Sequence, residues 1–343
     1  TFFLVVRLLL AFWSRKVFID YLGSDLVGLS STLTNILGLL NLADLGLTTV
    51  IASALYKPLF AKDKDTIRDI VSIFGYLFRL IGTFILTAGI VLSFFLPVIF
   101  EGKGIPISDV YVAYYAFLGS SLLGYFFNYR MNILEADQKN YIITGIVNTS
   151  NLVKIIMQIA LLKLLGGSYT EWVALELVFA IVIAICINAA LRKQYPWLRT
   201  DWRYGRSIRG KYKHLFRTIR QIIPHNIGSY VLNQTDSLLI FAFVSLSMVT
   251  VYTNYSMVVY HTALIMTTVS AGLNAGVGNL IAEGDKSRIK KVFHEFQALY
   301  FGIAGILVVC LNYLMEPFIN LWLGEGFLLY RSILYLILFN TYV

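Results

Sequence analysis

The sequence predicts an all-helical protein that crosses a membrane several times, and three observations support this prediction. Of the 343 residues, 58% are hydrophobic and only 14% are charged, with a mean hydropathy of +0.72. A soluble domain is about half apolar and about one quarter charged. Long apolar runs recur along the chain, and the charge of the connections between them alternates. These runs do not fit the roughly 10-residue alternation of outer-membrane barrel strands, so the expected fold is a transmembrane helical bundle.

Ten apolar runs approach or exceed the roughly 20 residues that a helix needs to cross a bilayer. The expected spans are residues 1–21, 26–55, 70–99, 110–134, 141–165, 172–191, 219–244, 248–281, 292–315 and 327–343. The first run already includes Thr1 and the last still includes Val343, so we expect this sequence to be a fragment of a longer, transporter-sized chain.

The connections between these runs predict the orientation. Alternate connections hold nineteen basic residues, ten of them within 192–220, whereas the opposite connections hold only Lys103 and Arg331. Basic loops stay in the cytoplasm, which places the amino terminus there too. The alternative for 192–220 is a nucleic-acid patch, but contact with anionic lipid headgroups explains the charge at lower cost. We therefore expect anionic membrane lipids, and no nucleic acid, as partners.

An internal repeat predicts two lobes. Residues 63–70 resemble residues 285–292, and each segment is a basic loop that runs into an apolar helix. This match implies a repeat unit of six spans with the same orientation, a pattern typical of transporters that handle substrate between two halves. We expect a six-helix lobe over 1–191, a basic linker over 192–218, and a second lobe over 219–343 with about four helices.

Ionisable residues inside spans cost about 2.5–3.5 kcal/mol each on insertion scales and usually face a bundle interior or a wet cavity. Four basic residues lie deep in expected spans, namely Arg7, Arg15, Arg79 and Lys154. They could line a cationic cavity or hold helices together through ion pairs. The acidic partners available for such pairs are Asp44, Glu176 and Asp236.

Asp44 and Asp236 lie near asparagines at helical spacings, on the second and seventh spans. Hydrogen bonds between helices, worth about 0.6 kcal/mol on average, would explain these polar groups. The functional alternative is a cation or proton site in which Asp44 or Asp236 changes charge during transport. We expect no metal site and no cofactor, because the chain has no metal-binding cluster or phosphate-binding loop.

Six short motifs follow one another along the chain, namely RKVFIDYLG at 15–23, GL at 28–29, NLADLGL at 41–47, LYKPL at 55–59, ADQKNY at 136–141 and LWLG at 321–324. In this order they resemble the motifs of bacterial polysaccharide flippases, the O-antigen and capsule oligosaccharide transporters of the multidrug/oligosaccharidyl-lipid/polysaccharide exporter superfamily. The resemblance covers nearly the whole chain, although such proteins have twelve or more spans.

The resemblance implies that the protein flips an undecaprenyl-pyrophosphate-linked oligosaccharide from the cytoplasmic to the outer leaflet of the bacterial inner membrane by alternating access. A cationic central cavity would receive the pyrophosphate, and this role would fall to Arg7, Arg15, Arg79 and Lys154. H⁺ and Na⁺ are the candidate coupling ions, and polysaccharide assembly proteins are candidate partners.

Three alternatives stay open. A multidrug exporter of the same superfamily would need an acidic cavity for cationic drugs, whereas the first lobe is basic. A lipid II flippase would also bind the pyrophosphate of its substrate. A membrane glycan polymerase or ligase would need a substantial loop or domain with acid–base residues, and the expected outer loops are short. We therefore expect a transporter and not an enzyme.

Overall fold

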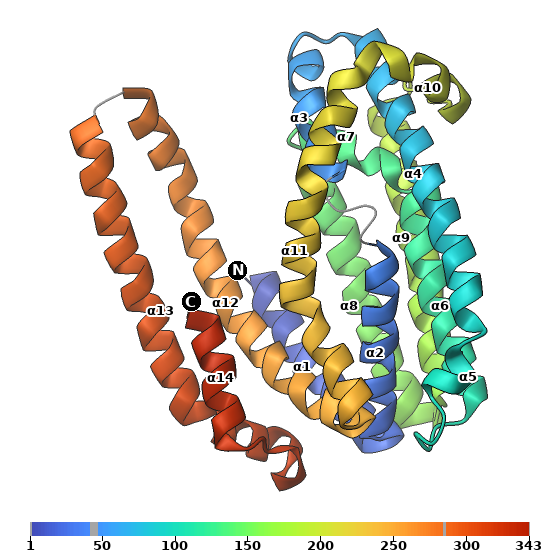
Figure 1. Cartoon of the computed structure of the whole chain (residues 1–343), viewed down its shortest axis with the longest axis vertical. Coiled ribbons are helices and arrows are strands. Elements are labelled where there is room, and N and C mark those ends of the chain that lie inside the picture. The colour runs from blue at the N-terminus through green and yellow to red at the C-terminus, as the bar shows by residue number, and fades with distance from the viewer. Residues whose placement is uncertain (1, 42–46, 284–285, 343) are drawn as a thin grey trace. The chain divides into compact units, whose positions relative to one another are not determined.

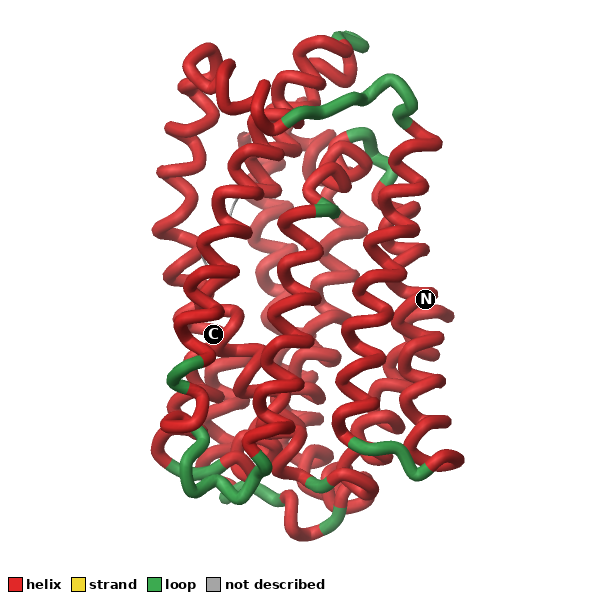
Figure 2. The backbone as a smooth tube through the Cα atoms, turned by 90° about the vertical axis from the view of Figure 1, so that its right-hand side faces the viewer, coloured by secondary structure: helices red, strands yellow, loops and turns green. Residues whose placement is uncertain are grey.

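A computed structural model of the chain describes residues 2–41, 47–283 and 286–342. Every regular element in these ranges is a helix, which confirms the predicted all-helical class (Figure 1). Loops and turns, drawn green in Figure 2, connect successive helices. The chain forms two compact units, Thr1–Ser247 and Met248–Val343. The lobe boundaries expected from the repeat remain a prediction.

The first unit holds eleven α-helices among its described residues. They are α1 (Phe2–Leu22), α2 (Ser24–Leu40), α3 (Leu47–Phe60), α4 (Lys64–Ser93), α5 (Leu96–Ile99), α6 (Ile107–Phe126), α7 (Asn132–Ala136), α8 (Asn140–Leu165), α9 (Tyr169–Gln194), α10 (Trp202–Ile208) and α11 (Lys213–Phe243). Two short 3₁₀ helices, η2 (Tyr129–Met131) and η3 (Arg209–Tyr212), lie between α6 and α7 and between α10 and α11.

Tight connections keep neighbouring helices together. Gly23 alone separates α1 from α2, and its φ of 88° is one that residues with a Cβ rarely adopt. Gly166 ends α8 in the left-handed conformation, and Ser168 then starts α9 with a capping box completed by Glu171. As a result, α8 and α9 pack against each other directly.

The core of the first unit lies where α6 meets α4 and α9, and where α1 meets α8. Tyr114 of α6 is fully buried, and its hydroxyl donates to the carbonyl of Gly89 at 2.7 Å. Val17 of α1 packs against Ile159 and Leu162 of α8. Between helices in a bilayer, such close packing and hydrogen bonds replace the hydrophobic effect as the main source of stability.

Most apolar runs correspond to single helices, but three expected spans are divided. The run 26–55 was expected as one helix, but α2 ends at Leu40 and α3 begins at Leu47. The run 70–99 is divided between α4 and α5, and the run 110–134 between α6 and α7. Residues 192–218, expected as a linker, contain α10 and η3.

By length and hydropathy, α4, α8, α9 and α13 can each cross a bilayer. The segments Ile107–Phe126 and Tyr129–Ala136, which meet at 47°, form a fifth candidate span. This count covers the described residues only. The helices α1, α11 and α12 have 21, 31 and 38 residues and are also long enough to span. A multi-pass membrane protein follows from these helices, whereas the number of ten spans remains a prediction.

The second unit is formed mainly by three helices, α12 (Leu246–Glu283), α13 (Lys286–Leu323) and α14 (Arg331–Tyr342), with the 3₁₀ helix η4 (Glu325–Phe327) between the last two. Its core contains Met315 and Ile319 of α13, and α14 buries Leu334. The hydroxyl of Tyr255 on α12 accepts a hydrogen bond from the backbone N–H of Leu329 at 3.1 Å, which fixes the chain just before α14.

Candidate functional site

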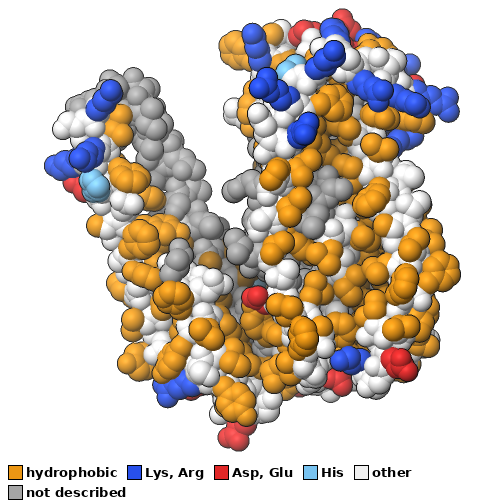
Figure 3. Space-filling view, in the orientation of Figure 1, with side chains coloured by type: hydrophobic (Ala, Val, Ile, Leu, Met, Phe, Trp, Pro, Cys, Tyr) orange, Lys and Arg blue, Asp and Glu red, His pale blue; other side chains and the backbone are white. Residues whose placement is uncertain are grey.

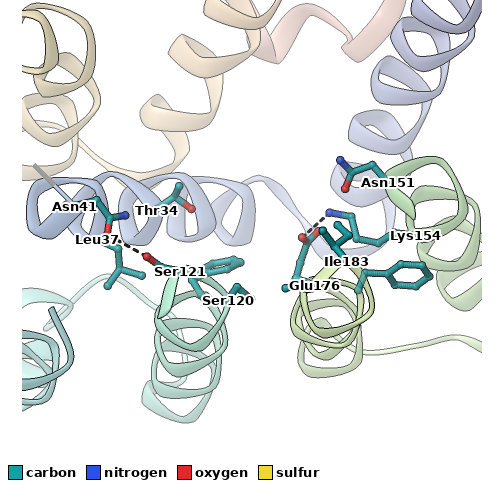
Figure 4. Close-up of a pocket in the computed structure, with 12 residues that line it drawn as sticks. Thr34, Leu37, Asn41, Ser120, Ser121, Asn151, Lys154, Glu176 and Ile183 are labelled. Carbon is teal, nitrogen blue, oxygen red and sulfur yellow. Dashed lines mark hydrogen bonds and ion pairs between the residues drawn. The ribbon is translucent and has the colours of Figure 1, made fainter. Parts of the chain in front are cut away.

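A cavity of about 280 Å³, lined by polar as well as apolar side chains, opens inside the first unit (Figure 4). Four helices enclose it, namely α2, α6, α8 and α9. Its polar lining consists of Thr34 from α2 and Asn41 just after the end of α2, Ser120 and Ser121 from α6, Asn151 and Lys154 from α8, and Glu176 from α9. Leucine, isoleucine and phenylalanine side chains complete the wall. The cavity therefore combines hydroxyl and amide groups with one cation and one anion.

The sequence of α8 explains why one side of this helix is polar. Asn148, Asn151, Lys154 and Gln158 recur at intervals of three or four residues. At about 100° per residue, they occupy an arc of about 120° on the helix. Lys154 and Gln158 of this arc contact Glu176 of α9, whereas Asn148 contacts Arg7 of α1. The polar arc of α8 therefore faces both α9, at the cavity, and α1.

An ion pair crosses the cavity between α8 and α9. Lys154 Nζ lies 2.6 Å from Glu176 Oε2, and the two side chains are only 17% and 22% exposed. The other carboxylate oxygen, Oε1, accepts from Gln158 Nε2 at 2.9 Å. The carboxylate of Glu176 is thus bound at both oxygens, and the charge of Lys154 is balanced. Figure 4 shows the ion pair of Lys154 with Glu176.

The opposite wall is a neutral hydrogen-bond network. Asn41 Oδ1 accepts from Ser121 Oγ at 3.0 Å and from the Tyr125 hydroxyl at 3.2 Å, which joins α2 to α6. The Ser30 and Tyr169 hydroxyls are hydrogen-bonded to each other at 2.9 Å, which joins α2 to α9. These contacts hold the polar face of α2 toward the other helices.

The predicted basic residues occupy different environments. Lys154 lines the cavity in the ion pair with Glu176, which is one of the two arrangements that the sequence left open. Arg7 is exposed on α1 and its Nη1 donates to Asn148 Oδ1 on α8 at 3.2 Å. Arg15 is partly buried on α1, and no hydrogen bond or ion pair joins it to any residue that the structure describes.

Arg79 lies apart from the other three. Its guanidinium is exposed and stacks 5.1 Å from the ring centre of Trp202, the first residue of α10. It is not among the residues that line the cavity. The structure therefore brings Arg7 and Lys154 onto the same polar side of α8, and places Arg79 against the linker.

Of the two predicted coupling residues, the structure describes only Asp236. Asp44 lies outside the described residues. Asp236 is partly buried on α11 and does not line the cavity. The described residues contain no group of three or more His, Cys, Asp or Glu side chains that could hold a metal ion.

A buried carboxylate of α4, that of Asp69, binds three residues of the linker. Asp69 accepts from the Tyr204 hydroxyl at 2.9 Å and from the Tyr212 hydroxyl at 3.1 Å, and Lys211 Nζ lies 3.3 Å from it. The hydrogen bond to Asp69 raises the pKa of Lys211, and burial raises the pKa of Tyr212. A Cβ at Gly205 would collide with the backbone of Ser72, so α10 approaches α4 closely.

Sequence reasoning missed most of the neutral lining. Thr34, Ser120, Ser121 and Asn151 were not singled out, because such residues also occur as ordinary hydrogen-bonding groups within membrane helices. The regular spacing of polar residues along α8 was the available signal, since it predicts one polar face in an otherwise apolar helix.

Comparison with known proteins supports the fold. No protein-family model matches the chain, and no curated protein is similar to it. A solved structure described as the inward-facing conformation of a multidrug resistance MATE family transporter of the MOP superfamily is similar, with a TM-score of 0.67 and 15% sequence identity. The match covers 95% of this chain and 74% of that chain. At this identity the likeness establishes a shared fold.

Proposed function

We propose that this chain is a membrane transporter of the MOP superfamily that flips a lipid-linked oligosaccharide, carried on undecaprenyl pyrophosphate, from the cytoplasmic to the outer leaflet of the bacterial inner membrane. The observation that carries the proposal is the cavity of the first unit, in which hydroxyl and amide groups surround a charge-balanced ion pair. The likeness to a MATE transporter supports the transporter class.

The lining suits a sugar. A hydroxyl that enters apolar surroundings without a hydrogen bond costs roughly 2–7 kcal/mol, so an oligosaccharide needs many protein partners to cross a bilayer. Thr34, Ser120 and Asn151 present such partners in the cavity. Since Lys154 and Glu176 neutralise each other, the cavity does not select for a charged sugar or a cation.

The pyrophosphate needs cations, and α1 offers two. Arg7 donates only to a neutral amide, and Arg15 has no partner among the described residues. A guanidinium without an acidic partner is suited to a phosphate, which it can bind with two parallel hydrogen bonds. We assign the pyrophosphate mainly to Arg7 and Arg15, and Lys154 and Arg79 remain predicted contacts that variants can test.

Multidrug export is the second candidate, and the name of the similar structure favours it. A cationic drug requires an acidic cavity, but the Glu176 carboxylate is already bound by Lys154 and Gln158. A lipid II flippase is a third candidate, since its substrate also combines sugars with a pyrophosphate. Asp44 and Asp236 stay proposed sites for H⁺ or Na⁺ coupling, and anionic lipids and polysaccharide assembly proteins stay proposed partners.

Deletion of the full-length gene in its host tests this proposal, with lipid extracts and surface glycan analysed together. We expect lipid-linked oligosaccharide to accumulate inside the cell while surface polysaccharide is lost. The wild-type gene and a Lys163→Ala control, which changes an exposed lysine at the end of α8, should restore the glycan. An Arg7→Ala/Arg15→Ala variant should not restore it at equal protein level. Unchanged glycan with altered sensitivity to cationic drugs would instead favour multidrug export.

A further inference from the structure

A second cavity, of about 450 Å³, lies at the end of the first unit where α9 finishes. Three arginines line it, namely Arg130 from η2, Arg192 from the last turn of α9, and Arg199 from the segment that leads to α10. It shares no lining residue with the cavity that contains Lys154 and Glu176. In Figure 3, Lys and Arg side chains gather at the end of this unit that carries α10.

The arginine from η2 is held in place. Arg130 Nε donates to the Tyr129 hydroxyl at 3.2 Å, and the guanidinium lies 5.5 Å from the centre of the Tyr129 ring. The Tyr129 hydroxyl is in turn hydrogen-bonded at 3.0 Å to Oγ1 of Thr200, which also lines the cavity. This arrangement uses one of the five N–H groups of Arg130 and leaves the terminal ones for a ligand.

Part of the cavity wall is formed by buried, largely apolar side chains. Leu191, Tyr195 and Leu198 line the cavity, and each is less than one tenth exposed. The Tyr195 hydroxyl donates to Asp137 Oδ2 at 2.6 Å, and Lys139 Nζ lies 2.7 Å from the same oxygen. This carboxylate is therefore committed to Tyr195 and Lys139.

The three arginines lack acidic partners. No carboxylate lines the cavity, and no ion pair joins Arg130, Arg192 or Arg199 to an acidic residue within the described part of the chain. Cations that share a cavity repel one another, and a single anion of two or more charges would relieve this repulsion. Arginine binds phosphate more specifically than lysine does, because its planar fork matches two phosphate oxygens at once.

We propose that this cavity is a binding site for a phosphate-class anion, separate from the transport cavity and built by Arg130, Arg192 and Arg199. The ligand is either the phosphorylated headgroup of a membrane lipid or a free phosphate compound, since both present the same oxygens. A headgroup would enter beside the lipid-facing end of α9, whereas a free phosphate would enter from water.

The test compares two double variants with equal loss of charge. Arg192→Gln/Arg199→Gln removes two exposed arginines from the cavity, and neither side chain makes a hydrogen bond or ion pair with the described residues. Arg206→Gln/Arg209→Gln removes two exposed arginines from α10 and η3, outside the cavity. Binding of inorganic pyrophosphate is measured by thermophoresis in neutral detergent. Retention of phosphatidylglycerol is measured by native mass spectrometry after extraction from mixed phosphatidylglycerol–phosphatidylcholine vesicles.

We expect the cavity variant to lose affinity at least tenfold for one of the two probes, and the matched control to stay within twofold of wild type. Loss confined to phosphatidylglycerol identifies a lipid headgroup, and loss for pyrophosphate identifies a free phosphate compound. Equal losses in both variants, or wild-type binding of both probes by the cavity variant, would overturn the proposal. Circular dichroism and elution volume check that both variants fold. These measurements do not depend on transport, so the proposed flippase activity can fail while this site stands.

Discussion

The ion pair between Lys154 and Glu176 predicts how variants at these two positions change the free energy of unfolding. Replacing Lys154 by Met removes the cation and leaves a carboxylate inside the cavity, held only by Gln158. Replacing Glu176 by Gln leaves an ammonium facing a neutral amide. The double variant removes both charges and keeps a hydrogen-bonding group at position 176, so it should be less destabilised than the two single effects added together.

The structure sets the size of these effects. Removing one partner of a fully buried pair costs about 3–5 kcal/mol, because the other charge is left uncompensated. Here the side chains are 17% and 22% exposed, and Glu176 keeps its bond from Gln158. We therefore expect a loss of about 2–3 kcal/mol for Lys154→Met and about 1–2 kcal/mol for Glu176→Gln, after discounting the buried-pair value for access of water.

The assay is a double-mutant cycle on the free energy of unfolding, measured by titration with a denaturing detergent in mixed micelles. We expect a coupling of about 1.5–2.5 kcal/mol, within the range for residues in direct contact. Lys163→Met is the matched control, because that exposed lysine has only a cation–π contact with Trp13, and it should cost at most about 1 kcal/mol. Additivity of the two single variants within about 0.5 kcal/mol would show that the pair does not interact as described.

Three further predictions concern the packing around the site. Gly205→Ala should cost about 1–3 kcal/mol, because the new methyl meets backbone of α4, whereas Gly210→Ala, which meets nothing, should be neutral within about 0.5 kcal/mol in the same unfolding titration. Burial disfavours ionisation of Asp137, but hydrogen bonds from Lys139 and Tyr195 outweigh it and lower its pKa. A lowered carboxyl pKa contributes stability that is present above the ordinary pKa of about 3.9 and is lost as pH falls through the folded value. Tyr195→Phe should therefore lower the free energy of unfolding by about 1–2 kcal/mol at pH 7. This difference from wild type should disappear below about pH 4. A difference that does not depend on pH would contradict the role of Asp137. Asn41→Ala should lower stability by about 1–3 kcal/mol, because it leaves two hydroxyls of α6 without their acceptor, and a thermal melt unchanged from wild type would argue against this network.

The apolar pattern was sufficient to predict the helices, and polar interruptions explain where it was inaccurate. Runs such as 141–165 agree closely with α8, because a long apolar stretch that ends at a glycine leaves few alternatives to a helix. The expected single helix over 26–55 was wrong because α2 ends at Leu40, directly before the polar residue Asn41. The helix α10 was missed because its stability comes from contact with α4 and not from its own hydropathy.

The candidate site was predicted in part. Lys154 was predicted as a site residue because it is a charged residue inside a span, and Glu176 was named among its possible ion-pair partners. Which of the two arrangements occurs depends on the register of α8 against α9, which involves residues far apart in the sequence. Arg79 was expected with the other cations, but its side chain stacks on Trp202, a contact that depends on how α10 folds back onto α4.

We propose that this protein carries the sugar headgroup of a lipid across a bilayer, and a reconstituted flipping assay tests this proposal most directly. The full-length protein would be placed in vesicles that contain a polyprenyl-pyrophosphate-linked oligosaccharide, and a membrane-impermeant lectin would report the headgroups that reach the outer leaflet. We expect headgroups to appear faster than in protein-free vesicles, and Arg7→Ala/Arg15→Ala to abolish the increase. Exposure no faster than in protein-free vesicles, together with transport of a cationic dye by the same preparation, would contradict it.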